Sequence, residues 1–203
     1  MTALATMVQP LLDLIGHNVV WALATVFVVS AAEALFIVGL FIPSTVVLVG
    51  VGTLVGIGQL PFLPVFVAAT AGAIVGDAMS YWFGHTYRDR IRETNFFRRY
   101  HKVIARSEAF FQRFGPASIF LGRFVPGVKA LVPAVAGIAG MGVAEFTAIN
   151  VTSAVAWAGL HIVPPVLVAM GVSLGSSWAW AAVMLALAVG AGFLVMHRGW
   201  RGA

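Results

Sequence analysis

Four charged residues lie inside stretches of the chain that are otherwise apolar: Glu33, Asp77, Arg123 and Lys129. A charge at membrane depth is costly unless it is paired, hydrated or neutralised by a proton, so each is a candidate site residue. Glu33 lies in the apolar run from Val19 to Ile42, which makes it a candidate proton carrier. The alternative is a structural carboxyl that accepts hydrogen bonds from a broken helix end.

Arg123 and Lys129 lie on either side of Pro126, in a segment where glycine and proline interrupt any helix. Arginine offers a planar fork of donors, lysine offers a point charge, and free N–H groups at a helix start add partial positive charge. Together they predict a site for a phosphate or a carboxylate. Alternatively, both long side chains extend to the lipid headgroups.

Asp77 and Tyr81 lie one helical turn apart, on the same face of a predicted span. Asp77 is a candidate partner for a base of the broken segment, and the alternative is an ordinary carboxylate that accepts a hydrogen bond from Tyr81. The chain has no cysteine and no paired histidines at metal-ligand spacing, so we expect no metal site, no cofactor and no catalytic residues. Ser173 stands in a nucleophile-elbow pattern, but between two apolar runs.

The amino-acid composition indicates that these residues lie in lipid rather than in water. Of 203 residues, 61% are hydrophobic and 9% are charged, whereas about 25% are charged in ordinary soluble domains. Runs of about 20 apolar residues are long enough to cross a bilayer, and four occur: Val19 to Ile42, Pro61 to Phe83, Phe146 to Val168 and Trp178 to Met196. We therefore expect an all-α, polytopic integral membrane protein, either as a monomer or as an oligomer.

The basic residues cluster in one segment, 85–114, between the second and third apolar runs. Because cytoplasmic loops of membrane proteins are rich in lysine and arginine, we expect this loop and the C-terminus to be cytoplasmic. Its apolar residues recur at helical spacing, which predicts an interfacial helix on anionic headgroups rather than a nucleic-acid-binding surface. The bases assigned to the headgroups are Arg98, Arg99, Lys102 and Arg106.

The segment from Gly115 to Gly140 must enter and leave the membrane on one side if both flanking regions are cytoplasmic, so it is a re-entrant candidate. The sequence Gly122-Arg123-Phe124-Val125-Pro126 echoes Gly39-Leu40-Phe41-Ile42-Pro43, which predicts inverted repeats within a single membrane domain, 1–203. The first repeat is 33–84, the second is 115–170, and a C-terminal span covers 178–196. Two ordinary crossings between Val19 and Gly58 would also fit the first half.

These residues resemble the DedA family of bacterial membrane proteins, whose domain is shared with lipid scramblases of eukaryotic endomembranes. The resemblance covers roughly Glu33 to Trp157 and is most specific from Phe114-Gly115 through Gly122-Arg123-Phe124-Val125-Pro126 to Lys129; the stretch from Gly76-Asp77 to Tyr81 and Gly84 is a second match. It implies two facing re-entrant hairpins in inverted repeats. The positions assigned to the hairpin tips are Pro43, Ser44, Thr45, Gly122, Pro126, Gly127, Pro133 and Gly137.

The resemblance further implies translocation of a lipid or lipid phosphate across the bacterial cytoplasmic membrane, with undecaprenyl phosphate as the leading substrate and the proton gradient as a proposed energy source. Two positions depart from the family pattern: Lys129 replaces an arginine, and Thr45 replaces an acidic residue. Thr45 cannot ionise, so the sequence is also compatible with a passive scramblase. It is compatible as well with a proton-linked small-ion transporter, an intramembrane hydrolase using Ser173, or a membrane helper that transports nothing.

Overall fold

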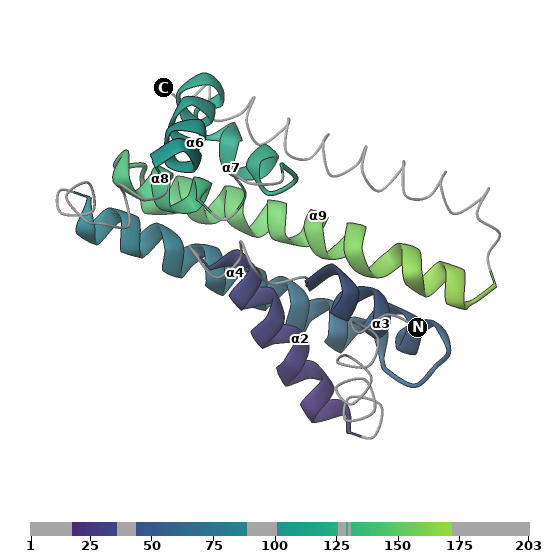
Figure 1. Cartoon of the computed structure of the whole chain (residues 1–203). Coiled ribbons are helices and arrows are strands. Elements are labelled where there is room, and N and C mark those ends of the chain that lie inside the picture. The colour runs from purple at the N-terminus through teal and green to yellow at the C-terminus, as the bar shows by residue number, and fades with distance from the viewer. Residues whose placement is uncertain (1–17, 36–43, 89–100, 126–128, 130, 172–203) are drawn as a thin grey trace.

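The computed structural model describes residues 18–35, 44–88, 101–125, 129 and 131–171 (Figure 1). Within these ranges the chain forms helices and turns and no strand, which agrees with the predicted all-α class. In chain order the helices are α2 (Val19–Ala34), α3 (Ser44–Gly56), α4 (Phe62–Tyr87), α6 (His101–Phe114), α7 (Ala117–Gly122), α8 (Val132–Ile138) and α9 (Val143–Ala169). The predicted C-terminal span lies outside the described residues.

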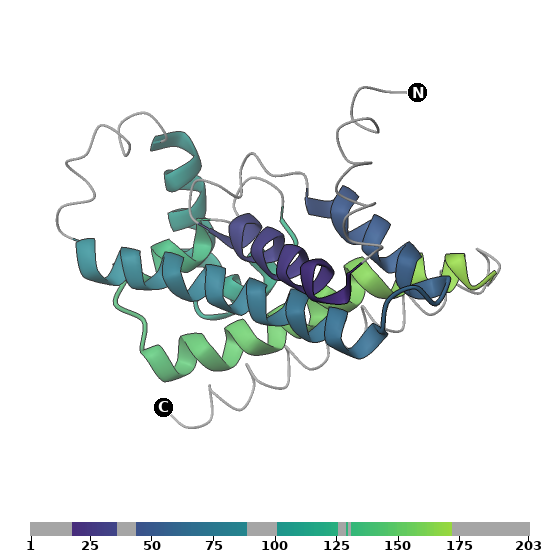
Figure 2. The same ribbon diagram turned by 90° about the horizontal axis from the view of Figure 1, so that it is seen from below.

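Two helices, α4 and α9, are long and apolar enough to cross a membrane. They contain 26 and 27 residues, which corresponds to about 40 Å of helix against a hydrocarbon thickness of about 30 Å. The predicted spans Pro61 to Phe83 and Phe146 to Val168 are thus confirmed as long apolar helices. They run side by side in opposite directions and form the frame of the molecule (Figures 1 and 2).

Helix α2 covers the first part of the first apolar run. It has 16 residues, and its backbone turns extended at Leu35, where φ is −70° and ψ is 134°. Sixteen residues span about 24 Å, which is less than the hydrocarbon thickness. The apolar run predicted from Val19 to Ile42 continues past the end of α2, and its last part, 36–42, lies outside the described residues.

Helix α2 packs along α4 at very short range. A Cβ atom added to Gly76 of α4 would lie 2.2 Å from the carbonyl oxygen of Ala31, so only glycine allows this approach. Ser80 then donates a hydrogen bond of 3.1 Å to the carbonyl of Ala34. These contacts place the last turn of α2 against the middle of α4.

The glycine- and proline-rich segment between Gly115 and Gly140 is broken, as predicted. Helices α7 and α8 have six and seven residues, so each extends only about 10 Å. They meet at a turn that includes Arg123 to Val125. Neither helix can cross a bilayer, and the entry of this segment into the membrane remains a prediction.

Helix α6 lies at the end of the frame where α4 ends and α9 begins, beside α7 and α8, and it runs across the direction of α4 in Figure 2. Ile104 and Ser107 are buried, whereas Lys102, Arg106 and Arg113 are exposed. The amphipathic helix predicted for this segment is confirmed over His101–Phe114. The remaining bases assigned to headgroups, Arg98 and Arg99, lie outside the described residues.

Candidate functional site

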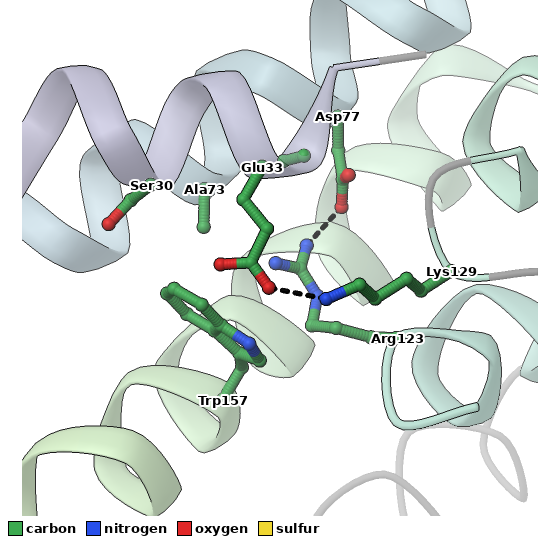
Figure 3. Close-up of a pocket in the computed structure, with 8 residues that line it drawn as sticks. Ser30, Glu33, Ala73, Asp77, Arg123, Lys129 and Trp157 are labelled. Carbon is green, nitrogen blue, oxygen red and sulfur yellow. Dashed lines mark hydrogen bonds and ion pairs between the residues drawn. The ribbon is translucent and has the colours of Figure 1, made fainter. Parts of the chain in front are cut away.

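A small, partly open pocket lies where α2, α4, α9 and the turn between α7 and α8 meet (Figure 3). It is lined by Ser30, Glu33, Ala34, Ala73, Asp77, Arg123, Lys129 and Trp157. All four charged residues that the sequence places in apolar surroundings therefore reach one site. Among the described residues, no three histidine, aspartate or glutamate side chains gather as metal ligands.

The pocket lies deep within the frame. Asp77 is ten residues before the end of α4 at Tyr87, a separation of about 15 Å. Glu33 reaches the same level from α2, because the close contact at Gly76 brings the last turn of α2 to this part of α4.

Arg123 is held by three side chains from the two long helices. Its Nη2 pairs with Oδ2 of Asp77 on α4 and donates a hydrogen bond of 2.7 Å to Oδ1 of Asn150 on α9, while its Nε donates to Oγ of Ser153 at 3.1 Å. Both charged side chains are only 7% exposed. Removing one partner of a buried ion pair costs about 3–5 kcal/mol, so this contact joins the broken segment firmly to both helices.

Lys129 and Glu33 form the second ion pair, with 2.5 Å between Nζ and Oε1. Figure 3 shows the two side chains pointing toward each other above the indole of Trp157. The Glu33 side chain is 4% exposed and that of Lys129 is 33% exposed. Within the described residues, nothing hydrogen-bonds Oε2 of Glu33 or the hydroxyl of Ser30.

This pairing answers several questions that the sequence left open. Asp77 contacts a base of the broken segment and not Tyr81, whose hydroxyl donates to the carbonyl of Met141. Arg123 does not extend to the headgroups, because its side chain is buried on Asp77. Glu33 pairs with Lys129, and the carboxylate that pairs with Arg123 is Asp77.

Tyr81 does not line the pocket. Its ring stacks on Phe146 with 4.1 Å between ring centroids, and it belongs to a buried cluster that joins α4 to α8 and α9. The role in transport predicted for Tyr81 stays a prediction. The position of Tyr81 near Asp77 in sequence is misleading, because its ring turns toward the end of the bundle.

Only some of the positions assigned to the hairpin tips lie within the described residues. Ser44 and Thr45 begin α3, Gly122 ends α7 and is buried, and Pro133 and Gly137 lie buried within α8. Pro43, Pro126, Gly127 and the serine of the elbow pattern, Ser173, lie outside the described residues. None of the described tip positions lines the pocket.

Several site residues were not predicted from the sequence, among them Asn150, Ser153 and Trp157. These three lie on one face of α9, at spacings of three and four residues, within a run that is largely apolar. A buried asparagine in a spanning helix needs polar partners, and Asn150 has them: Arg123 and the carbonyl of Ile74, which accepts from Nδ2 at 3.0 Å. The helical spacing of these residues was the feature of the sequence from which they could have been predicted.

Comparison with known proteins agrees with this architecture. Residues 42–164, more than half of the chain, match the VTT domain. The chain belongs to the DedA family. The matched region includes Asp77, Arg123, Lys129 and Asn150, whereas Glu33 precedes it.

The DedA family relatives are bacterial membrane proteins. The inner membrane protein YabI of Escherichia coli K12 is 28% identical over 95% of this chain and 78% of its own length. Protein DedA of the same strain is 30% identical over 72% of this chain and 68% of its own length. Undecaprenyl phosphate transporter A of Bacillus subtilis 168 is 30% identical over 68% of this chain and 67% of its own length.

No solved structure matches the chain. The DedA family and the long apolar helices together identify a bacterial integral membrane protein with a transporter-like role.

Proposed function

We propose that the protein moves lipids with a phosphate headgroup across the bacterial cytoplasmic membrane, with undecaprenyl phosphate as its first candidate substrate. The observation that carries this proposal is the pocket, where two cations meet two carboxylates between apolar helices. Cations in such surroundings favour an anionic substrate group. The relative named undecaprenyl phosphate transporter A supports the choice of lipid.

The two carboxylates occupy the places that a phosphate would take. In the conformation described here, Glu33 and Asp77 neutralise Lys129 and Arg123. A phosphate that replaces a carboxylate keeps the cation paired, so the cation itself is never left as a bare charge in a low dielectric. We expect only the headgroup to enter the pocket, with the lipid chain in the bilayer beside the bundle.

We further propose that α2–α3 and α7–α8 are re-entrant hairpins of two inverted repeats, 33–84 and 115–170. The packing supports this arrangement, because α3 lies on α9 while α8 lies on α4. Both contacts are made at glycine: an added Cβ would lie 2.5 Å from the carbonyl of Val166 at Gly56, and 2.2 Å from that of Tyr81 at Gly137. The second hairpin helix of each repeat thus packs on the long helix of the other repeat, as expected for an inverted repeat.

Glu33 provides a route to proton coupling. If Lys129 turns to a phosphate, the carboxylate of Glu33 is left buried with neither oxygen paired. A buried unpaired carboxylate takes up a proton instead of remaining charged. Proton uptake by Glu33 would therefore accompany arrival of the substrate, even though Thr45 cannot ionise.

The test is uptake of labelled undecaprenyl phosphate by vesicles that contain the purified protein, beside a labelled phospholipid, with and without a proton gradient. We expect movement of the polyprenyl lipid that the gradient stimulates, and loss of this stimulation in Glu33→Gln. Movement of both lipids without a gradient would indicate a passive scramblase. If neither lipid moves although the protein is inserted, the proposal fails in favour of a small-ion transporter or a membrane helper.

A further inference from the structure

The two cations of the pocket are held very differently. Arg123 has three side-chain partners, and its side chain is 7% exposed. Lys129 has one partner, Glu33, within the described residues, and its side chain is 33% exposed. The lysine is thus the more accessible cation and the one with fewer bonds to break.

The two cations also differ in which side chains would lose a bond if the cation turned to a ligand. If Arg123 turned to a ligand, Asp77 would lose its cation and both Asn150 and Ser153 would lose a donor, and all three side chains are buried. If Lys129 turned to a ligand, Glu33 alone among the described residues would lose a partner. Within the same residues, Oε2 of Glu33 and the hydroxyl of Ser30 already lack a hydrogen-bond partner, and both side chains line the pocket.

We infer that Lys129 is the cation that binds the incoming phosphate, that Glu33 is the competitor it leaves, and that Arg123 keeps its contact with Asp77 throughout. This inference rests on the proposed function and specifies which half of the site exchanges partners. It replaces the symmetric expectation that both bases receive the headgroup. The site therefore consists of one fixed ion pair and one exchangeable ion pair.

The two carboxylates allow a matched test by substitution to the neutral amides, Glu33→Gln and Asp77→Asn. The probe is farnesyl phosphate, and its affinity for the full-length protein in detergent is measured by calorimetry. Removing the competitor should strengthen binding, so Glu33→Gln should bind about tenfold more tightly than the parent. Asp77→Asn should show no such gain, and Arg113→Gln on α6 is the control for loss of one distant charge.

Lysine labelling supplies a second measurement that needs no variant. The chain has two lysines, Lys129 and Lys102, and Lys102 is exposed on α6. With farnesyl phosphate at about ten times its Kd, occupancy of about 90% should lower acetylation of Lys129 by up to about tenfold, as read by mass spectrometry. Acetylation of Lys102 should stay unchanged, and farnesol, which lacks the phosphate, should protect neither lysine.

Three results would overturn the assignment. The first is a gain of affinity in Asp77→Asn that equals the gain in Glu33→Gln, since Arg123 would then be the exchanging cation. The second is unchanged acetylation of Lys129, or equal protection of both lysines, while the probe is bound. The third is a parent protein that does not bind farnesyl phosphate, which would overturn the proposed function as well, whereas the first two would leave that function intact.

Discussion

At the scale of single residues, the site depends on how each buried polar group is paired. Arg123, Asp77 and Asn150 form a connected network, and each lies where water is scarce. In such a network, removing one member lowers the free energy of unfolding by more than the bonds of that member contribute, because the remaining members stay buried without a partner. Substitutions within the network should therefore lower stability more than substitutions at exposed positions of the same helices.

Replacement of Asn150 by leucine should destabilise the protein. Asn150 is 1% exposed and bridges Arg123 to the carbonyl of Ile74, so the variant leaves unpaired groups worth about 1–3 kcal/mol each. Denaturant titration in detergent measures the change. The neighbouring Val151→Leu, on the exposed side of α9, is the control, and equal stability of the two variants would contradict the bridging role.

Removal of one partner of the fixed ion pair should cost more than removal of both. Asp77→Asn leaves Arg123 buried without a counter-charge, at a cost of about 3–5 kcal/mol. The double variant Asp77→Asn/Arg123→Gln leaves no bare charge and should recover part of this loss. A double-mutant cycle of unfolding free energies measures the coupling, and purely additive losses would argue against a direct pair.

At the scale of helices, close packing sets the position of each charged group. Helices in membranes associate through small residues that let their backbones approach. The contact of Gly76 with α2 determines the level at which Glu33 meets Lys129. Helix α6, at one end of the frame, instead presents bases outward.

Gly76→Ala should therefore be destabilising and should lower transport. Alanine favours helix by about 1 kcal/mol over glycine, but its Cβ would lie 2.2 Å from the carbonyl oxygen of Ala31. Overpacking of this kind costs about 1–3 kcal/mol and would displace α2 from α4. Gly142→Ala is the control, since nothing lies within 4 Å of its added Cβ. Similar unfolding midpoints and uptake rates for the two variants would contradict this account.

The exposed bases of α6 should increase attraction to anionic lipid. Replacing Lys102 and Arg106 by glutamine removes two charges, each worth about 1 kcal/mol near an anionic surface. We expect slower uptake in vesicles rich in phosphatidylglycerol and no change in zwitterionic vesicles. An equal loss in both kinds of vesicle would indicate a structural role for these bases.

At the scale of the whole molecule, the question is how the chain crosses the membrane. Helices α4 and α9 are long and apolar enough for two crossings, and α6, α8 and the start of α9 lie at one end of this frame (Figures 1 and 2). A re-entrant α7–α8 segment would start and finish on the side where α6 lies. The loop between α3 and α4 lies at the opposite end of the frame.

Cysteine labelling should reveal this topology without background, because the chain contains no cysteine. Single cysteines at Gln112 and Ala144 flank the broken segment, and one at Gln59 marks the α3–α4 loop; all three positions are exposed. A maleimide that cannot cross membranes should label Gln59→Cys in intact cells and the other two only after the cells are opened. Labelling of Gln112→Cys and Ala144→Cys from opposite sides would contradict the re-entrant segment.

The sequence by itself was enough to predict a lipid environment and the two long apolar helices. It also predicted the break between Gly115 and Gly140 and identified the charged residues of the pocket. These features are local, since they depend on runs of apolar residues, on helix breakers and on charges that lipid tolerates poorly. Only the tertiary structure decided that Arg123 pairs with Asp77 and Lys129 with Glu33, and that Asn150, Ser153 and Trp157 complete the site. Pairing depends on which face each helix turns inward and at what level, and both are set by contacts such as that of Gly76 with Ala31, between residues far apart in the chain.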